Sequence, residues 1–132
     1  EYELVNKQTK IRFDERRLTQ ILLNLVSNAV KFTSSEGTIT IKVRLLEAGK
    51  DLGELLPQEL RRFYNSDDLL EVSVSDTGIG ITEEDMPKLF KMNGFLKKTE
   101  EINTRGIGLG LHICRELVRV AGGDIICESK WQ

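Results

Sequence analysis

The sequence predicts an α+β fold, a two-layer sandwich with helices packed on one face of a mixed, mostly antiparallel sheet. Two segments, 14–32 and 108–121, carry apolar residues at helical spacing. Strand-like stretches lie before, between and after these segments, which is typical of helices and strands that share one core. A chain of 132 residues can bury such a core but is short for two domains, so we expect a single domain over residues 1–132.

The composition is that of an ordinary soluble domain, with 39% hydrophobic and 30% charged residues. The 19 basic and 21 acidic residues nearly balance, which argues against a basic module that tracks nucleic-acid phosphates. No apolar run approaches the ~20 residues of a membrane span. Two cysteines and one histidine make neither a disulfide framework nor a zinc site. Without a signal peptide at its start, the chain is expected to be a piece of a longer protein, either cytoplasmic or on the cytoplasmic face of a membrane-anchored parent. We expect no nucleic-acid or membrane contact from this piece itself.

The first half of the chain predicts strands around one long helix. Strand-like stretches at 2–5 and 10–13 precede Asp14, whose side chain suits the N-cap of a helix that runs to Phe32. The apolar residues of that helix are Leu18, Ile21, Leu22, Leu25, Ala29 and Phe32. Residues 38–46 then alternate apolar and polar side chains, as a half-buried strand does. The residues expected to face inward there are Ile39, Ile41, Val43 and Leu45.

The second half begins with a polar, irregular stretch at 47–68, interpreted as a surface excursion, and a strand at 70–75. Thr82, followed by three acidic residues, is typical of a helix N-cap with acids near the positive end of the helix dipole. The apolar face of that helix would consist of Met86, Leu89 and Phe90. The chain then predicts a charged exposed loop, a helix and a strand, at 91–105, 108–121 and 124–128.

One face of the first helix carries a polar row, which consists of Gln20, Asn24, Asn28 and Lys31. Spacings of four, four and three residues place these side chains on one helix face. Asparagine is a poor helix-interior residue, so two of them in one row need an explanation. The row is either an ordinary solvated face or a set of amide oxygens and an ammonium directed at a metal-bound phosphate chain, because Mg²⁺ prefers oxygen ligands.

A turn follows directly on the strand at 70–75. Its residues are Asp76, Thr77, Gly78, Ile79 and Gly80. A carboxylate at a strand end can accept a hydrogen bond from an exocyclic amine, and glycines let the backbone pass close to a flat ring. The same residue types are also common in plain turns, so both interpretations remain open.

A second glycine motif opens the helix at 108–121, with the residues Gly106, Ile107, Gly108, Leu109, Gly110 and Leu111. Backbone N–H groups at a helix N-terminus bind phosphate. The motif does not match the dinucleotide-binding fingerprint, because Leu111 stands where the third glycine would be. It is not a P-loop either, because no Gly-Lys-Ser or Gly-Lys-Thr follows.

Taken together, these motifs resemble those of the sensor histidine kinases. Residues 24–33 resemble the N box, 76–80 the G1 box, 89–90 the F box and 106–111 the G2 box, all in family order. The resemblance covers residues 14–129. It implies the catalytic ATP-binding domain of a histidine kinase, with the Bergerat fold that gyrase, heat-shock chaperone and mismatch-repair ATPases share.

The resemblance also implies a role for each matching residue. Asp76 would bind the adenine amino group, and Asn28 would coordinate Mg²⁺ with Asn24 nearby. Lys31 would contact the phosphates of ATP, and Lys97, Lys98 or Arg105 would be the candidates to reach the γ-phosphate. The other implied ATP-binding residues are Gly78, Ile79, Gly80, Phe90, Gly106, Gly108, Leu109, Gly110 and Leu111. Catalysis would consist of positioning and charge neutralisation, as expected for phosphoryl transfer.

Position 24 separates the branches of this superfamily. The chaperone, gyrase and mitochondrial dehydrogenase-kinase branches carry a glutamate four residues before the metal-binding asparagine, where it serves as the general base. Here that position is Asn24, which cannot take a proton at neutral pH. A neutral imidazole is already a nucleophile and needs less help, so the sequence favours histidine phosphorylation over hydrolysis.

The resemblance is incomplete in several places. His112 follows the G2 glycines without the acidic neighbour of an H box, so it is interpreted as a surface or packing histidine and the phosphoacceptor hairpin is absent. The closing Gly-Thr-x-Phe segment and last strand of the family are also missing, and the F box is irregular. We expect a monomeric domain that phosphorylates a histidine on a separate dimerisation domain of its parent, with a response-regulator receiver domain downstream. The alternatives are a degenerate nucleotide- or partner-binding module and, less favoured, an ATP hydrolase.

Overall fold

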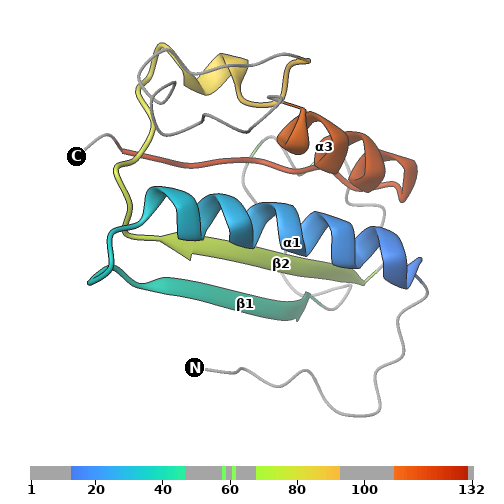
Figure 1. Ribbon diagram of the computed structural model, residues 1–132. Coiled ribbons are helices and arrows are strands. Elements are labelled where there is room, and N and C mark those ends of the chain that lie inside the picture. Colours follow the sequence, from blue (N-terminus) through green and yellow to red (C-terminus); the bar gives the residue numbers. More distant parts are fainter. Residues whose placement is uncertain (1–12, 47–57, 59–60, 62–67, 93–108, 131–132) are drawn as a thin grey trace.

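The computed structural model describes residues 13–46, 58, 61, 68–92 and 109–130. Its elements are helix α1 (Glu15–Phe32), strands β1 (Ile39–Leu46) and β2 (Leu69–Asp76), the 3-10 turn η2 (Met86–Lys88) and helix α3 (Gly110–Val120). Helix α1 lies along the sheet formed by β1 and β2, and α3 packs beside α1 (Figure 1). Helices layered on an antiparallel sheet confirm the predicted α+β class.

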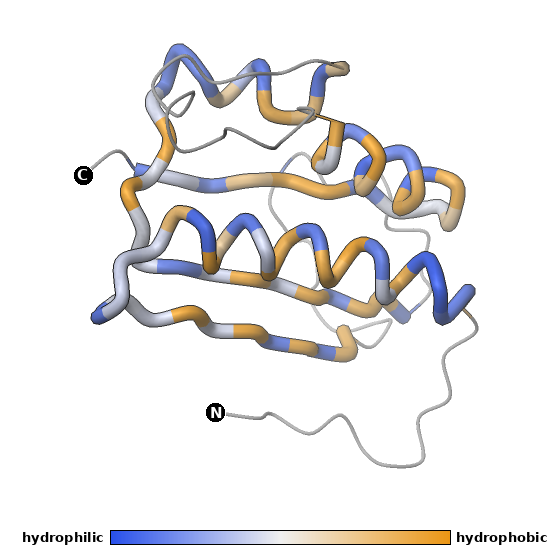
Figure 2. Tube along the Cα trace, in the orientation of Figure 1, coloured by the Kyte–Doolittle hydropathy of each residue, from blue (hydrophilic) through white to orange (hydrophobic). Residues whose placement is uncertain are grey.

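Helix α1 begins and ends where the sequence predicted. The Asp14 carboxylate accepts hydrogen bonds from the backbone N–H groups of Arg16 and Arg17, at 3.0 and 3.2 Å, which satisfies two of the four free donors at the helix start. Ile21 and Ala29 are buried on the inner face. Polar and apolar residues alternate turn by turn along the helix (Figure 2), so its amphipathic pattern matches its position against the sheet.

The two strands pair antiparallel, with a register that runs from Ile39 opposite Asp76 to Leu46 opposite Leu69. Both strands match their predicted ranges to within one residue. The alternation is confirmed only in part, because Ile41 was expected to face inward and is 44% exposed. In the described residues β1 pairs with β2 alone, so one edge of β1 has no neighbouring strand. The register brings Asp76 to the end of the sheet beside the C-terminal end of α1.

The helices are joined by a small core. Cys114 of α3 is fully buried, and its Sγ lies 3.9 Å from the backbone oxygen of Ile21 on α1. Ala29 and Leu89 are also buried. Burial raises the pKa of the Cys114 thiol. Cys114 and Cys127 are both free thiols. Cys114 lies in the core, and Cys127 is partly buried.

The prediction that a helix starts at Thr82 is wrong. The backbone oxygen of Thr82 accepts from the N–H groups of Asp85 and Met86, and the chain makes turns that lead only to the 3-10 turn η2. Pro87 lies inside this turn and has no backbone N–H to donate, so a longer hydrogen-bonded helix is disfavoured there. The segment nevertheless places the buried Leu89 against the core, as its apolar pattern required.

The strand predicted at 124–128 is also wrong for the described structure. The chain after α3 runs as a segment without regular secondary structure (Figure 1). A strand needs a hydrogen-bonded neighbour, and among the described residues none pairs with the backbone of this segment. A side chain holds it instead, since the hydroxyl of Ser129 accepts from the backbone N–H of Ile81 at 2.9 Å.

Several predictions concern residues outside the described ranges. These are the strand at 2–5, most of the strand at 10–13, nearly all of the excursion at 47–68, and most of the loop at 91–105. Among the described helices, none combines the length and the apolar content that crossing a bilayer requires.

Candidate functional site

The polar row of α1 meets the start of α3 at one specific contact. The side-chain amide of Asn24 lies against Gly110, where a Cβ would stand 2.8 Å from Asn24 Nδ2 and closer still to Oδ1. Only glycine permits this approach without displacing the amide. The contact brings together two motifs that lie far apart in the sequence. Asn24, Asn28 and Lys31 all lie partly exposed along the same helix.

The first turn of α3 can bind an anion. Leu109 occupies the N-cap position and supplies no side-chain cap, while its backbone oxygen accepts from Ile113 in the first intrahelical bond. The N–H groups of Gly110, Leu111 and His112 precede that bond and have no partner within the helix. Uncapped N–H groups at the positive end of a helix dipole favour phosphate. The described ranges do not include the predicted residues Lys97, Lys98, Arg105, Gly106 and Gly108.

The turn after β2 is bound tightly to the C-terminal end of α1. The N–H of Ile79 donates to the backbone oxygen of Phe32 at 3.2 Å. A Cβ on Gly78 would stand 2.7 Å from Asp76 Oδ1 and closer still to the Phe32 oxygen. Gly80 has φ 73°, in the left-handed region that favours glycine. Both glycines are therefore required by the backbone, and the turn places Asp76 beside the end of the polar row.

The exposed Asp76 carboxylate has one oxygen engaged within the turn. Oδ1 accepts from the N–H of Gly78 at 2.9 Å, which fixes the orientation of the carboxylate. No donor among the described residues reaches Oδ2, so one oxygen can accept from a ligand. Cys127 lies close enough to sense this charge: burial is the main cause of the raised pKa of its thiol, and Asp76 and Glu128 raise it further.

A residue without an assigned role in the sequence also belongs to this region. The hydroxyl of Thr33, directly after α1, is buried and has no hydrogen-bond partner among the described residues. A Cβ on Gly37 would touch the Thr33 methyl group and lie 3.0 Å from the Thr77 hydroxyl, so the turn after α1 packs closely on the turn after β2. A buried unpaired hydroxyl is costly and marks a place where a polar ligand atom fits. Thr33 ends the N-box match, which is the only sequence signal for it.

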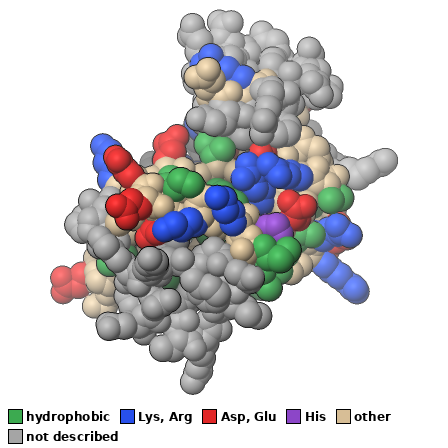
Figure 3. Space-filling model, turned by 90° about the horizontal axis from the view of Figure 1, so that it is seen from above, with side chains coloured by type: hydrophobic (Ala, Val, Ile, Leu, Met, Phe, Trp, Pro, Cys, Tyr) green, Lys and Arg blue, Asp and Glu red, His purple; other side chains and the backbone are tan. Residues whose placement is uncertain are grey.

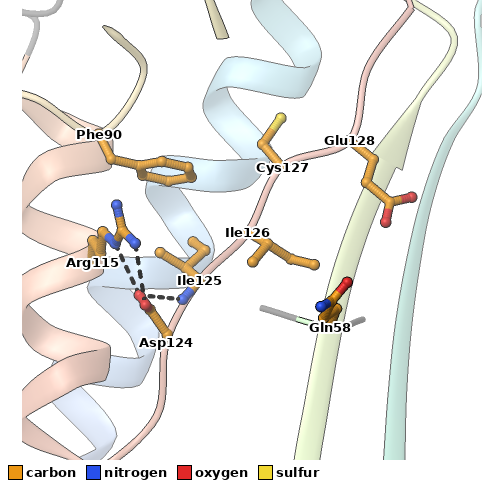
Figure 4. A pocket seen from close by; sticks show the side chains of 8 residues that line it. All are labelled: Gln58, Phe90, Arg115, Asp124, Ile125, Ile126, Cys127 and Glu128. Carbon is orange, nitrogen blue, oxygen red and sulfur yellow. Dashed lines mark hydrogen bonds and ion pairs between the residues drawn. The ribbon is translucent and has the colours of Figure 1, made fainter. Parts of the chain in front are cut away.

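Phe90 makes its described contacts with α3. The guanidinium carbon of Arg115 lies 5.2 Å from the ring centroid, and Nδ1 of His112 lies 3.1 Å from the Phe90 backbone oxygen. The expectation that His112 is a packing histidine fits this contact. Phe90 also lines a cavity of about 480 Å³ between α3 and the segment that follows it (Figure 4). No described contact joins Phe90 to the polar row of α1.

One of the residues that line this cavity is a buried carboxylate, Asp124. Asp124, whose side chain is 3% exposed, pairs with Arg115 at 2.9 Å (Figure 4). It also pairs with Arg119 at 3.4 Å. The hydrogen bond from Arg115 is the main cause that holds the pKa of Asp124 well below its usual range. This group fastens the segment after α3 to the helix, and we interpret it as structural.

The face above α3 and η2 carries much of the visible charge. Figure 3 shows Lys and Arg side chains gathered around the single histidine, with carboxylates beside them. Lys88 pairs with Asp85 at 2.7 Å, and Arg119 lies 3.8 Å from Glu116. Part of the positive charge on this side of the molecule is therefore neutralised locally.

Comparison with known proteins gives the class of this domain. The family described as histidine kinase-, DNA gyrase B-, and HSP90-like ATPase matches residues 13–132, and the chain belongs to this family. It is 36% identical over 127 residues to the circadian input-output histidine kinase CikA of Synechococcus elongatus, covering 96% of this chain and 14% of that protein. It is 32% identical over 126 residues to the sensor histidine kinase WalK of Bacillus subtilis, covering 96% of this chain and 18% of that protein.

A third relative gives the same result. The adaptive-response sensory kinase SasA of Gloeothece citriformis is 33% identical over 116 residues, which cover 88% of this chain and 24% of that protein. The chain thus spans less than a quarter of the length of these relatives. The family and the relatives confirm the predicted class, an ATP-binding catalytic domain of the histidine kinase type with the Bergerat fold.

Proposed function

We propose that this domain binds Mg-ATP and donates the γ-phosphoryl group to a histidine on a separate phosphoacceptor and dimerisation domain of its parent protein. A response-regulator receiver domain would then accept the phosphoryl group downstream. The observation that carries the proposal is the contact of Asn24 with Gly110. It sets a row of amide and ammonium groups beside uncapped N–H groups, which together suit a metal-bound phosphate chain.

The residues present fit this ligand. The amide oxygen of Asn28 is a hard donor of the kind that Mg²⁺ prefers, and a bound Mg²⁺ would neutralise phosphate charge. Lys31 lies one turn further along the helix and would contact the phosphates. Asp76 would accept from the adenine amino group through the oxygen that Gly78 leaves open. The unpaired Thr33 hydroxyl offers a further hydrogen bond to the nucleotide.

The chemistry favours a nucleophile that needs no base. Asn24 stands where related ATPases carry a proton-accepting glutamate, and an amide cannot accept a proton at neutral pH. Water or a serine hydroxyl would lack activation at this position, whereas a neutral imidazole attacks without it. The histidine kinases among the relatives support the same choice of acceptor.

The first experiment is calorimetric titration of the chain with a non-hydrolysable ATP analogue, with and without Mg²⁺. We expect Mg²⁺-dependent binding that Asn28→Ala weakens and the control Val30→Ala, on the 61% exposed position of the same helix, leaves unchanged. The second experiment incubates the full-length parent with labelled ATP and measures acid-labile, alkali-stable phosphate. Binding without transfer would contradict kinase function and support the degenerate module.

A further inference from the structure

Helix α3 places a second residue, Cys114, against the part of α1 that carries Asn24. Cys114 and Gly110 are four residues apart, so they share one face of α3, which packs beside α1 (Figure 1). Gly110 lies against the Asn24 amide. The thiol of Cys114 approaches the backbone oxygen of Ile21, three residues before Asn24 on α1. Asn24 is therefore next to two successive turns of α3.

The single proton of the Cys114 thiol is already engaged. Its Sγ lies 3.9 Å from the backbone oxygen of Ile21, to which the thiol donates. A thiol carries one S–H donor, so the rest of the sulfur surface can only accept a hydrogen bond. Cys114 is 0% exposed, so bulk water does not reach it. A polar group that reaches the sulfur from another side therefore has to present a hydrogen.

The group that reaches the sulfur is the side-chain amide of Asn24. Burial raises the pKa of the Cys114 thiol, and the hydrogen bond with Asn24 opposes this rise. A hydrogen bond that lowers a thiol pKa is donated to the sulfur, because it stabilises the thiolate. The NH₂ group is the donor of an Asn side chain, so Nδ2 faces Cys114 and Oδ1 faces away. The contact with Gly110 agrees, since a Cβ there would lie closer to Oδ1 than to Nδ2.

We propose that Cys114 is a positioning residue, which holds the Asn24 amide with its oxygen toward the first turn of α3. The inference rests on the proposed function, because that turn is where the phosphates of Mg-ATP would bind. An amide oxygen suits a site for Mg²⁺, since this cation takes oxygen ligands, whereas an amide NH₂ group presents only hydrogens. Cys114 touches neither the nucleotide nor the metal and acts through Asn24 alone.

Two substitutions of Cys114 distinguish positioning from packing. Cys114→Ser keeps one donor and an acceptor, whereas Cys114→Ala keeps neither. In a purely structural role serine is the worse replacement, because a buried hydroxyl costs more than a small apolar side chain. In a positioning role serine is the better replacement for binding.

The measurement is calorimetric titration of the chain with the non-hydrolysable ATP analogue and Mg²⁺. We expect Cys114→Ala to lower the affinity about fivefold, as for one neutral hydrogen bond, and Cys114→Ser to stay within about twofold of the wild type. In urea titration Cys114→Ser should nevertheless be the less stable of the two. The order of the variants is thus opposite for binding and for stability, which a packing role alone would not produce.

Val118→Ala is the matched control. Val118 lies one turn further along α3, where its backbone oxygen accepts from the N–H of Gly123 at 3.1 Å. This variant should lower stability and leave the affinity for the ATP analogue unchanged.

The remaining results separate the positioning role from the proposed function. Asn24→Ala combined with Cys114→Ala should bind no more weakly than Asn24→Ala alone, and an additive loss would overturn the positioning role. Wild-type affinity in Cys114→Ala, or weaker binding in Cys114→Ser than in Cys114→Ala, would also overturn it and leave the proposed function standing. If the wild-type chain shows no Mg²⁺-dependent binding, the proposed function fails and the positioning role fails with it.

Discussion

The side chain of Asn24 lies against the α-carbon of Gly110, and this contact joins the middle of α1 to the first turn of α3. The two residues come from opposite ends of the chain, and neither could form the arrangement alone. Asn24 brings an amide to the helix start, and Gly110 lacks the side chain that would displace it. The position of the amide therefore depends on the residue at 110.

Replacing Gly110 by Ala should weaken nucleotide binding and leave the stability of the fold nearly unchanged. The new Cβ would overlap the Asn24 amide, which is the end of a short side chain and can rotate away at little cost in fold stability. Alanine also favours helix over glycine, so the free energy of unfolding should change by less than about 1 kcal/mol. We expect Mg²⁺-dependent affinity for the ATP analogue to fall several-fold, measured by calorimetry. The double variant Gly110→Ala with Asn24→Gly should lose no further affinity beyond Asn24→Gly alone; an additive loss would contradict the contact.

Replacing Gly78 by Ala should instead damage the fold. Its Cβ would overlap the backbone oxygen of Phe32 and crowd the Asp76 carboxylate, and a backbone atom within a helix end cannot rotate away. We expect a loss of about 2 kcal/mol in the free energy of unfolding, measured by urea titration, together with weaker nucleotide binding. Gly123→Ala is the control, because its Cβ would lie 3.2 Å from the Val118 side chain and 3.7 Å from the Val118 backbone oxygen, so it overlaps no backbone atom. Wild-type stability in Gly78→Ala would contradict the close packing of the turn on α1.

Substitution of Asp76 by Asn tests the adenine contact without changing the turn. The amide oxygen of Asn can still accept from the Gly78 N–H, so stability should be nearly unchanged. The second carboxylate oxygen becomes an NH₂ group, which cannot accept from the adenine amine. We expect at least about a tenfold loss of ATP-analogue affinity by calorimetry, as for a lost hydrogen bond to a charged group. Glu83→Gln, at an exposed acidic position before η2, should bind as the wild type does.

Local sequence signals were sufficient to predict where α1 begins and ends, but not where every other element forms. The bounds of α1 followed from Asp14 and its apolar spacing, because an N-cap and an amphipathic face are local features. The prediction of a strand at 124–128 was wrong, because a strand needs a hydrogen-bonded neighbour and the sequence pattern does not show whether one is present. The prediction of a helix from Thr82 was wrong, because it rested on the cap and the apolar spacing, whereas Pro87 has no backbone N–H for a longer helix.

The sequence indicated candidate residues for the site but not their contacts. The order of the motifs pointed to Asn24, Asp76 and Gly110, whereas the packing of Asn24 on Gly110 and of Gly78 on Phe32 required coordinates. Thr33 shows the limit most clearly. Its role as a buried unpaired hydroxyl arises from tertiary packing, which no local pattern in the sequence reports.

Asp124 should give the domain a specific acid sensitivity. Its pKa is lowered in the folded state, chiefly by the hydrogen bond from Arg115, so the charged form stabilises the fold. This stabilisation is fully present above the usual Asp pKa of about 3.9 and is lost as the pH falls from there toward the lower folded-state value. Asp124→Asn should therefore cost about 2 kcal/mol of unfolding free energy at pH 7, measured by urea titration.

The difference between Asp124→Asn and the wild type should shrink as the pH is lowered to about 3, because the wild-type carboxylate then begins to lose its advantage. Glu116→Gln is the control, since Glu116 is 57% exposed and lies 3.8 Å from Arg119, and an exposed pair of that kind contributes little. A difference that grows on acidification would show that the ion pair with Arg115 opposes folding. Equal stability of Asp124→Asn and the wild type at pH 7 would show that the segment after α3 is held by its apolar contacts alone.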